Sequence, residues 1–156
     1  MGIAGRDAKC KFVTEELGFD ACVSHLSPTL SADLAAVCQA GVDVYFENVG
    51  AKVFEAVLPL FNQAARMIIC GLIAHYGDAD GGIDRRAALM KLGEPIFKAR
   101  HVRVGNLSVS EFAAQHDEML AYVAPLVNAG KIKYREDIRQ GLENIPTAFA
   151  ERPDSA

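Results

Sequence analysis

The sequence predicts an α/β fold in which helices cover both faces of a parallel, doubly wound sheet. Short runs rich in β-forming residues alternate along the chain with longer stretches of helical hydrophobic period. The runs at residues 42–47 and 66–71 are mostly apolar, as expected for strands that are buried on both faces. We find no internal repeat or low-complexity linker, so we expect one fold unit in which strands and helices alternate.

The expected elements have recognisable boundaries. We expect strands at residues 2–4, 20–24, 42–47, 66–71 and 101–107. Asp7 is a plausible N-cap for a first helix, and Gly18 stands where a C-terminal glycine belongs. Ser31 can cap a second helix, and a third begins near Ala51, although Pro59 should kink or shorten it.

Composition excludes several classes of partner and site. The chain has 156 residues, of which 51% are apolar and 23% charged, enough for one domain with a core. A net charge of −4 argues against nucleic acid or an anionic membrane surface as the main partner. No apolar run approaches the roughly 20 residues of a membrane span, and no signal peptide pattern is present, so we expect a cytoplasmic protein. The four cysteines form no C-x-x-C pair, and we expect reduced, mostly buried thiols and no metal site: Cys10, Cys22, Cys38 and Cys70.

The residues after the first expected strand of this chain, at 2–4, indicate a phosphate site. Ligands of doubly wound sheets lie beyond the carboxyl ends of the strands, and a carboxylate there binds the ribose hydroxyls of NAD. This strand ends in Gly5 instead, and Arg6 and Lys9 follow at the start of a helix. Two basic residues without a carboxylate suit an additional phosphate. The alternative is that Arg6 and Lys9 are solvated residues of a surface helix.

Two later strands also end in candidate binding residues. Asn48 follows the third strand and can hydrogen-bond a ribose or an amide, and Gly50 lets the backbone approach a ligand closely. Equally, Asn48 can be a helix N-cap and Gly50 a turn residue. The next strand ends in Cys70 and Gly71 and leads to Tyr76; taken alone, Cys70 is expected in the core and Tyr76 at the surface.

Six segments together resemble a known family: GIAGRDAKCKF, LGFDACVSH, GVDVYFENVGAKVFEAVLPLFN, ARMIICGLIAHY, GKIKYREDI and GLENIPTAF. They are similar to the Rossmann-type, NADP-binding half of zinc-independent medium-chain dehydrogenase/reductases, in the leukotriene B4 dehydrogenase, prostaglandin reductase and curcumin reductase branch. The resemblance covers the chain to about Phe149, and residues 150–156 diverge. It implies NADPH-dependent reduction of the carbon–carbon double bond of α,β-unsaturated ketones or aldehydes.

The resemblance also implies roles for individual residues. Lys9, with Arg6 beside it, would meet the 2'-phosphate of NADP, and His25 would lie near the adenine end. Asn48 would lie against the cofactor, and the segment from Cys70 and Gly71 to Tyr76 would line it. The backbone of Asn106, Leu107 and Ser108 would flank the nicotinamide. Two positions depart from the family pattern: Ala51 replaces a glycine and Asn106 replaces a bulky apolar residue. No side chain is assigned as a catalytic acid.

The resemblance carries two expectations about assembly. Family members pair their last strand with a second copy, which implies a homodimer through the edge strand from His101 to Leu107. The family also places a substrate domain, a first strand and a Gly-rich turn before the residue matched by Met1. We therefore expect residues 1–156 to be a partial NADP-binding domain that lacks the first strand and is inactive alone. The alternatives are a truncated nucleotide-binding or dimerisation module without catalysis and, by fold analogy only, another nucleotide-using enzyme such as a methyltransferase.

Overall fold

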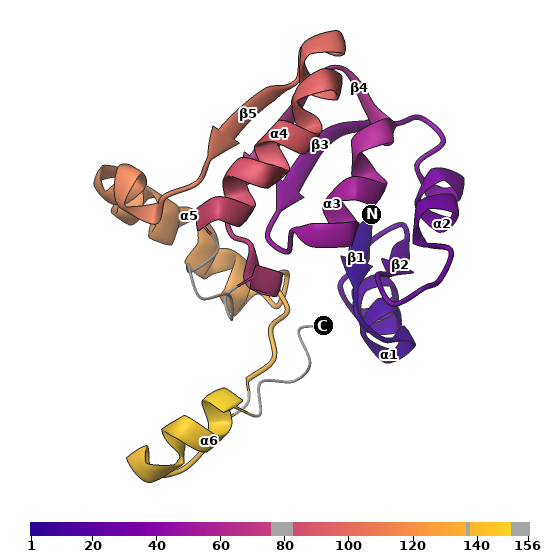
Figure 1. Cartoon of the computed structure of the whole chain (residues 1–156). Helices are drawn as coiled ribbons and strands as arrows, with labels where there is room; N and C mark the ends of the chain where they lie inside the picture. Colours follow the sequence, from indigo (N-terminus) through magenta and orange to yellow (C-terminus); the bar gives the residue numbers. More distant parts are fainter. Residues whose placement is uncertain (76–82, 137, 151–156) are drawn as a thin grey trace.

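The computed structural model describes residues 1–75, 83–136 and 138–150 of the chain. Within these residues five strands form two parallel sheets, and helices connect the strands (Figure 1). The predicted α/β class with parallel strands is therefore confirmed. No helix among the described residues is long and apolar enough to cross a membrane.

The first sheet is a small strand–helix–strand unit. Strand β1 (Gly2–Ala4) pairs in parallel with β2 (Cys22–Ser24), in the register Gly2↔Cys22 and Ala4↔Ser24. Helix α1 (Asp7–Lys11) and the π-helix η1 (Phe12–Glu16) connect them. The N-cap of α1 is Arg6 rather than the predicted Asp7, which lies in the first turn, and Gly18 follows η1 with a φ of 75°.

The second sheet contains the three longer strands in the order β3-β4-β5, all parallel. Helix α2 (Leu30–Val37) leads into β3 (Val42–Glu47). The N-cap of α2 is Thr29, two residues before the predicted Ser31; its hydroxyl donates to the Asp33 carboxylate instead of receiving a backbone N–H. After β3 come α3 (Ala51–Val57), the 3-10 turn η2 (Leu58–Leu60) and β4 (Phe61–Ile69). The helix gives way to the 3-10 turn beside Pro59, so the predicted shortening at this proline is confirmed.

The chain then crosses back over the sheet. The 3-10 turn η3 (Ile73–His75) follows β4, and α4 (Ile83–Ala99) leads into β5 (Arg103–Asn106). Beyond β5 lie η4 (Val109–Gln115), α5 (His116–Asn128), η5 (Leu142–Asn144) and α6 (Ile145–Ala150). Helix α6 projects away from the sheets (Figure 1). Arg135 ties this C-terminal part to η1 through an ion pair with Glu16 at 2.6 Å and a stacking contact on the Phe12 ring.

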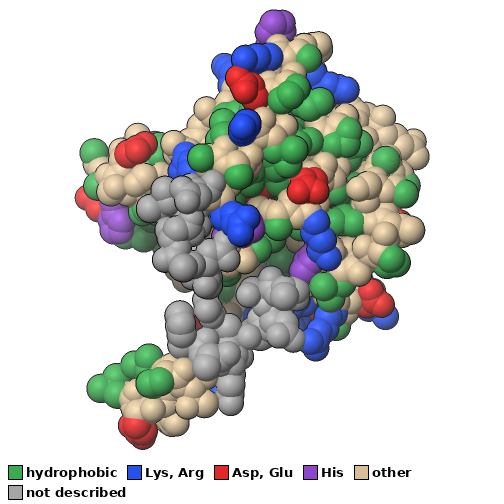
Figure 2. Space-filling view, in the orientation of Figure 1, with side chains coloured by type: hydrophobic (Ala, Val, Ile, Leu, Met, Phe, Trp, Pro, Cys, Tyr) green, Lys and Arg blue, Asp and Glu red, His purple; other side chains and the backbone are tan. Residues whose placement is uncertain are grey.

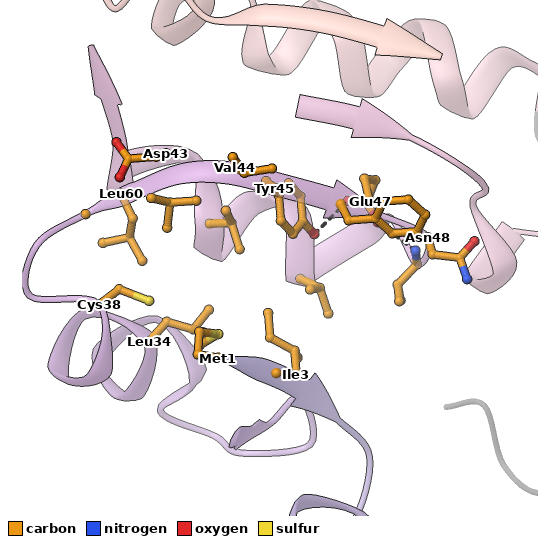
Figure 3. Close-up of a pocket in the computed structure, with 17 residues that line it drawn as sticks. Met1, Ile3, Leu34, Cys38, Asp43, Val44, Tyr45, Glu47, Asn48 and Leu60 are labelled. Carbon is orange, nitrogen blue, oxygen red and sulfur yellow. Dashed lines mark hydrogen bonds between the residues drawn. The ribbon is translucent and has the colours of Figure 1, made fainter. Parts of the chain in front are cut away.

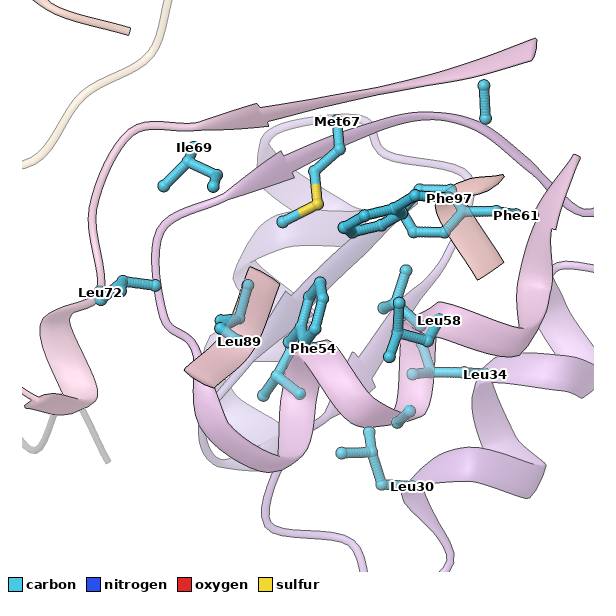
Figure 4. Packing of buried hydrophobic residues seen from close by; sticks show 14 of the residues in the cluster. Leu30, Leu34, Phe54, Leu58, Phe61, Met67, Ile69, Leu72, Leu89 and Phe97 are labelled. Carbon is cyan, nitrogen blue, oxygen red and sulfur yellow. The ribbon is translucent and has the colours of Figure 1, made fainter. Parts of the chain in front are cut away.

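The core lies between the second sheet and the helices α3 and α4 (Figure 4). Phe97 of α4 contacts Phe54 and Phe61 edge-to-face, with ring centroids 6.3 and 6.2 Å apart. Met67 in the central strand is completely buried beneath them. On the opposite face of β3, Val44 and Phe46 are 54% and 56% exposed. The expected helical cover therefore exists on one face of this strand among the described residues.

Candidate functional site

The carboxyl ends of β3, β4 and β5 lie level with one another at one edge of the second sheet. The register pairs Glu47 with Ile69 and Ile69 with Asn106. The backbone N–H of Leu107 donates to the Ile69 carbonyl at 2.9 Å, which holds the residue after β5 beside the end of β4. The structure therefore brings the predicted residues after these three strands to the same edge, as expected for the ligand edge of a parallel sheet.

Backbone hydrogen bonds join the segment after β3 to the segment after β4. The N–H groups of Cys70 and Gly71 donate to the Glu47 carbonyl at 2.8 and 3.3 Å. Ile73 N–H donates to the carbonyl of Asn48, and Ala74 N–H to that of Val49, both at 3.1 Å. The side chains of Asn48 and Cys70 are exposed at this junction. Cys70 is thus a surface residue, and the expectation that it belongs to the core is wrong, because its strand has already ended at Ile69.

Glu47 organises the turn on which Asn48 lies, and sequence reasoning missed it. Its side chain is completely buried. One carboxylate oxygen accepts the N–H groups of Val49 and Gly50 at 2.6 and 2.8 Å, and the other accepts the Tyr45 hydroxyl at 2.9 Å (Figure 3). Burial, and then the nearby Glu47 charge, raise the pKa of Tyr45. The signal in the sequence was a carboxylate at the end of a mostly apolar strand.

The turn after Glu47 uses unusual backbone conformations. Gly50 has a φ of 86°, an angle that favours glycine, and a Cβ there would crowd the His75 ring, 3.1 Å from its Cδ2. Ala51 follows with a φ of 49°, which is costly for any residue with a side chain. The position where the family pattern has a glycine is therefore a left-handed position in this chain.

The segment after β5 is held by a helix residue that the sequence analysis did not single out. The Arg86 guanidinium of α4 donates to the side-chain oxygen of Asn106. Asn106 is exposed, whereas Leu107 and Ser108 are half-buried. The amide that replaces an apolar family residue is thus fixed by a charged partner. Tyr76, the remaining predicted residue of this group, lies outside the described residues.

A second group of predicted residues lies where the first sheet ends. Arg6 and Lys9 are exposed on α1, and His25 is half-buried just after β2, with its backbone N–H donating to the Ala4 carbonyl at 2.8 Å. Burial lowers the pKa of His25, and the positive charges of Lys52 and Lys9 lower it further. These charges act on His25 from two elements, because Lys52 belongs to α3. The sequence analysis did not predict a role for Lys52.

A hollow lies between the two sheets. Figure 2 shows lysine or arginine and histidine side chains near one another at the middle of the molecular face. A cavity of about 720 Å³ lies between β1 and β3, and Asn48 is the predicted site residue that lines it. The described residues contain no group of three or more His, Cys, Asp or Glu side chains that could hold a metal ion.

Residues 1–124 match the family model described as zinc-binding dehydrogenase. The chain belongs to this family. Within it, the chain is a medium-chain dehydrogenase/reductase of the curcumin and alkenal reductase branch, as the sequence predicted. It corresponds to the C-terminal, nucleotide-binding portion of such proteins.

Individual relatives support this placement. The chain is 40% identical over 151 residues to the NADPH-dependent curcumin reductase of Escherichia coli, covering 96% of this chain and 43% of that protein. It is 31% identical over 151 residues to the NADP(+)-dependent 2-alkenal reductase of Nicotiana tabacum, covering 96% and 42%. The structure of CurA from Vibrio vulnificus in complex with NADPH has a TM-score of 0.81 at 40% identity, covering 95% and 44%. The chain thus spans less than half the length of these relatives.

Proposed function

We propose that this chain supplies the NADPH-binding part of a reductase that acts on the carbon–carbon double bond of α,β-unsaturated ketones or aldehydes. The observation that supports this most is that β3, β4 and β5 end at one edge of the sheet, where Asn48, Cys70 and Asn106 lie. In a parallel sheet, this is the edge at which nucleotides bind. The resemblance to a curcumin reductase and a 2-alkenal reductase supports the type of reaction.

The basic group after the first sheet fits the adenosine phosphate of NADPH. Lys9 lies on α1, Arg6 is the N-cap of that helix, and the positive charge of Lys52 on α3 acts on His25. Gly5 is buried and carries no carboxylate that would repel an additional phosphate. In this proposal Lys9 and Arg6 bind the 2'-phosphate, and His25 lies near the adenine. A charge-assisted hydrogen bond of about 1.5 kcal/mol corresponds to about a tenfold preference for NADPH over NADH.

The opposite end of the site would receive the nicotinamide. The backbone of Asn106, Leu107 and Ser108 would flank the ring, Asn48 would lie against the cofactor, and Cys70, Gly71 and Tyr76 would line it. NADPH supplies a hydride when it is bound, and hydrogen-bond donors must stabilise the negative charge that develops on the substrate oxygen. The contribution of this chain is to bind and orient, because hydride transfer depends mainly on positioning.

Cofactor titrations test the proposal directly. NADPH and NADH are titrated against the chain, Lys9→Ala and Lys11→Ala, which removes the same charge from the same helix. We expect about tenfold tighter binding of NADPH than NADH, lost in Lys9→Ala and kept in Lys11→Ala. Equal affinities for the two cofactors, or an equal effect of both substitutions, would contradict the assignment.

A second candidate function is a nucleotide-binding or dimerisation module that catalyses nothing by itself. The separation of β1 from β3 favours it, because a doubly wound sheet is normally continuous. Following the absorbance of NADPH in the presence of a simple enone, such as but-3-en-2-one, separates the two candidates. Turnover by the chain alone supports a complete reductase site, and NADPH binding without turnover supports the module.

We also propose that the protein forms a homodimer through the edge strand from His101 to Leu107. Among the described residues, β5 pairs with β4 on one side and with no strand on the other. An open edge of this kind readily pairs with a second chain. Light scattering should therefore give twice the mass of the 16.8 kDa chain at micromolar concentration. A mass of one chain under these conditions would contradict the dimer.

A further inference from the structure

An apolar groove separates β1 from β3 along their facing edges. Its volume is about 720 Å³, and its walls come from both sheets and from α2 and α3 (Figure 3). Apolar side chains make up most of the lining, among them Ile3, Leu34, Val42, Val53 and Val57. We call this space the edge groove. A cavity lined in this way favours an apolar occupant over water.

Both strands that face the edge groove have an unpaired edge. Among the described residues, β1 pairs with β2 alone and β3 with β4 alone. Each strand therefore presents backbone N–H and C=O groups to the groove without a strand partner. Figure 3 shows β1 and β3 running in the same general direction on its two sides. A segment in extended conformation between them could hydrogen-bond to both edges.

The side chains next to the edge groove also lack cover. Val44 and Phe46 line it and are 54% and 56% exposed. Parallel strands are normally buried on both faces, so exposed apolar residues at the middle of β3 indicate a face that another element covers. The buried acid of the lining, Glu47, already accepts hydrogen bonds at both oxygens. At this end of the groove, no carboxylate oxygen therefore remains to bind a positively charged occupant.

We propose that the edge groove binds a parallel β-strand of five or six apolar residues from a polypeptide outside this chain, joining both sheets into one. Strand β3 has six residues, which sets the length over which the occupant can pair. In the doubly wound order 3-2-1-4-5-6, a strand belongs between the positions that β1 and β3 occupy. The relatives have more than half of their length outside the match, so a polypeptide equivalent to that remainder can supply the strand. This inference goes beyond the proposed reductase function, because pairing of strands requires no cofactor.

Co-expression tests the docking. The full chain is produced together with a tagged form of the part of the Escherichia coli curcumin reductase that it does not match. The matched control is the same tagged part with the reductase's own remaining segment. We expect the chain to co-purify in equal amounts with the tagged part. Hydrogen exchange should slow on binding at those amides of residues 2–4 and 42–47 that point toward the groove rather than toward β2 and β4.

Two substitutions locate the contact. Val44→Glu places a charge at the edge groove, at a position exposed enough for the free chain to fold. Val109→Glu makes the same change in η4, at a residue that is 83% exposed and does not line the groove. We expect at least tenfold weaker binding for Val44→Glu and unchanged binding for Val109→Glu.

Four results would overturn the proposal. The first is failure to co-purify when the control pair does, and the second is an equal effect of both substitutions. The third is slowed exchange confined to β5, which would place the contact at the other edge. The fourth is slow exchange, in the chain alone, of those amides of residues 2–4 and 42–47 that point toward the groove rather than toward β2 and β4. The groove would then be closed by the chain itself or by a second copy. This last measurement needs no partner fragment and remains decisive if the control pair does not assemble.

Discussion

The buried carboxylate of Glu47 accepts the backbone N–H of Gly50 at 2.8 Å. A turn in which several N–H groups point inward leaves donors that no neighbouring strand can satisfy, and an unsatisfied buried donor costs about 1–3 kcal/mol. Glu47 resolves this by satisfying Val49 and Gly50 with one oxygen and Tyr45 with the other. The carboxylate thereby fixes the position of Asn48 relative to the end of β4.

Glu47→Gln should therefore destabilise the protein. The amide keeps one acceptor oxygen, but its NH2 group can only donate. This group would face either the Tyr45 hydroxyl or two backbone N–H groups, all of which donate to Glu47. We expect the free energy of unfolding in urea to fall by about 2 kcal/mol. Glu55→Gln, at an exposed position of α3, is the matched control and should change it by less than about 0.5 kcal/mol. Equal effects of the two substitutions would contradict the role of Glu47.

The stability of the protein should decrease as the pH falls through the pKa of an ordinary histidine. Burial, Lys52 and Lys9 lower the pKa of His25 in the folded chain. Below about pH 6.5, His25 therefore binds a proton more readily in the unfolded chain than in the folded chain. This difference favours unfolding. We expect the loss of unfolding free energy between pH 7.5 and pH 5.5, roughly spanning this pKa, to be smaller in His25→Gln. An unchanged pH dependence in that variant would show that His25 does not contribute.

The four cysteines should differ in their rates of alkylation. Burial and the neighbouring Cys10 raise the pKa of the Cys22 thiol to about 12, whereas Cys70 is exposed after β4. The thiolate is the reactive form, so Cys22 should be alkylated far more slowly than Cys70 near pH 8. Mass spectrometry of peptides after brief treatment with iodoacetamide measures both rates. Alkylation of Cys22 as fast as Cys70 would contradict the environment of Cys22.

The arrangement of the strands was predictable because apolar runs and helical periods alternate along the chain. The boundaries of the strands were less predictable. Strand β4 begins at Phe61, five residues before the predicted start, because its first part contains Asn62, Gln63 and an Ala64 with a φ of 58°. Asn62 is nevertheless held in the sheet by hydrogen bonds to the Ala40 carbonyl and the Asp43 carboxylate. Such tertiary partners override local β-propensity and are invisible in a short window of sequence.

Some residues of the candidate site could likewise be predicted from the sequence, and others could not. Asn48 and Cys70 could be singled out because residues after parallel strands meet at one edge, and Asn106 through the family resemblance. Lys52 and Arg86 could not, since each acts on a residue of another element. Glu47 was missed although its partners lie within three residues of it. Glu47 looks like part of a strand, and the two basic residues look like the solvated faces of helices. Their partners become apparent only when the helices are packed against the sheet.

Replacing Ala51 by glycine should stabilise the protein. Ala51 has a φ of 49°, and the left-handed region costs a residue with a Cβ about 1–2 kcal/mol that glycine avoids. Glycine loses more backbone entropy on folding, which offsets about 0.5–1 kcal/mol of this gain. We therefore expect Ala51→Gly to raise the free energy of unfolding by up to about 1 kcal/mol. The control is Ala87→Gly, an exposed residue inside α4, which should lower it by about 1 kcal/mol because helix interiors disfavour glycine. Opposite signs for the same chemical change would establish that the turn after Glu47 is left-handed at Ala51, and a loss of stability in both variants would contradict it.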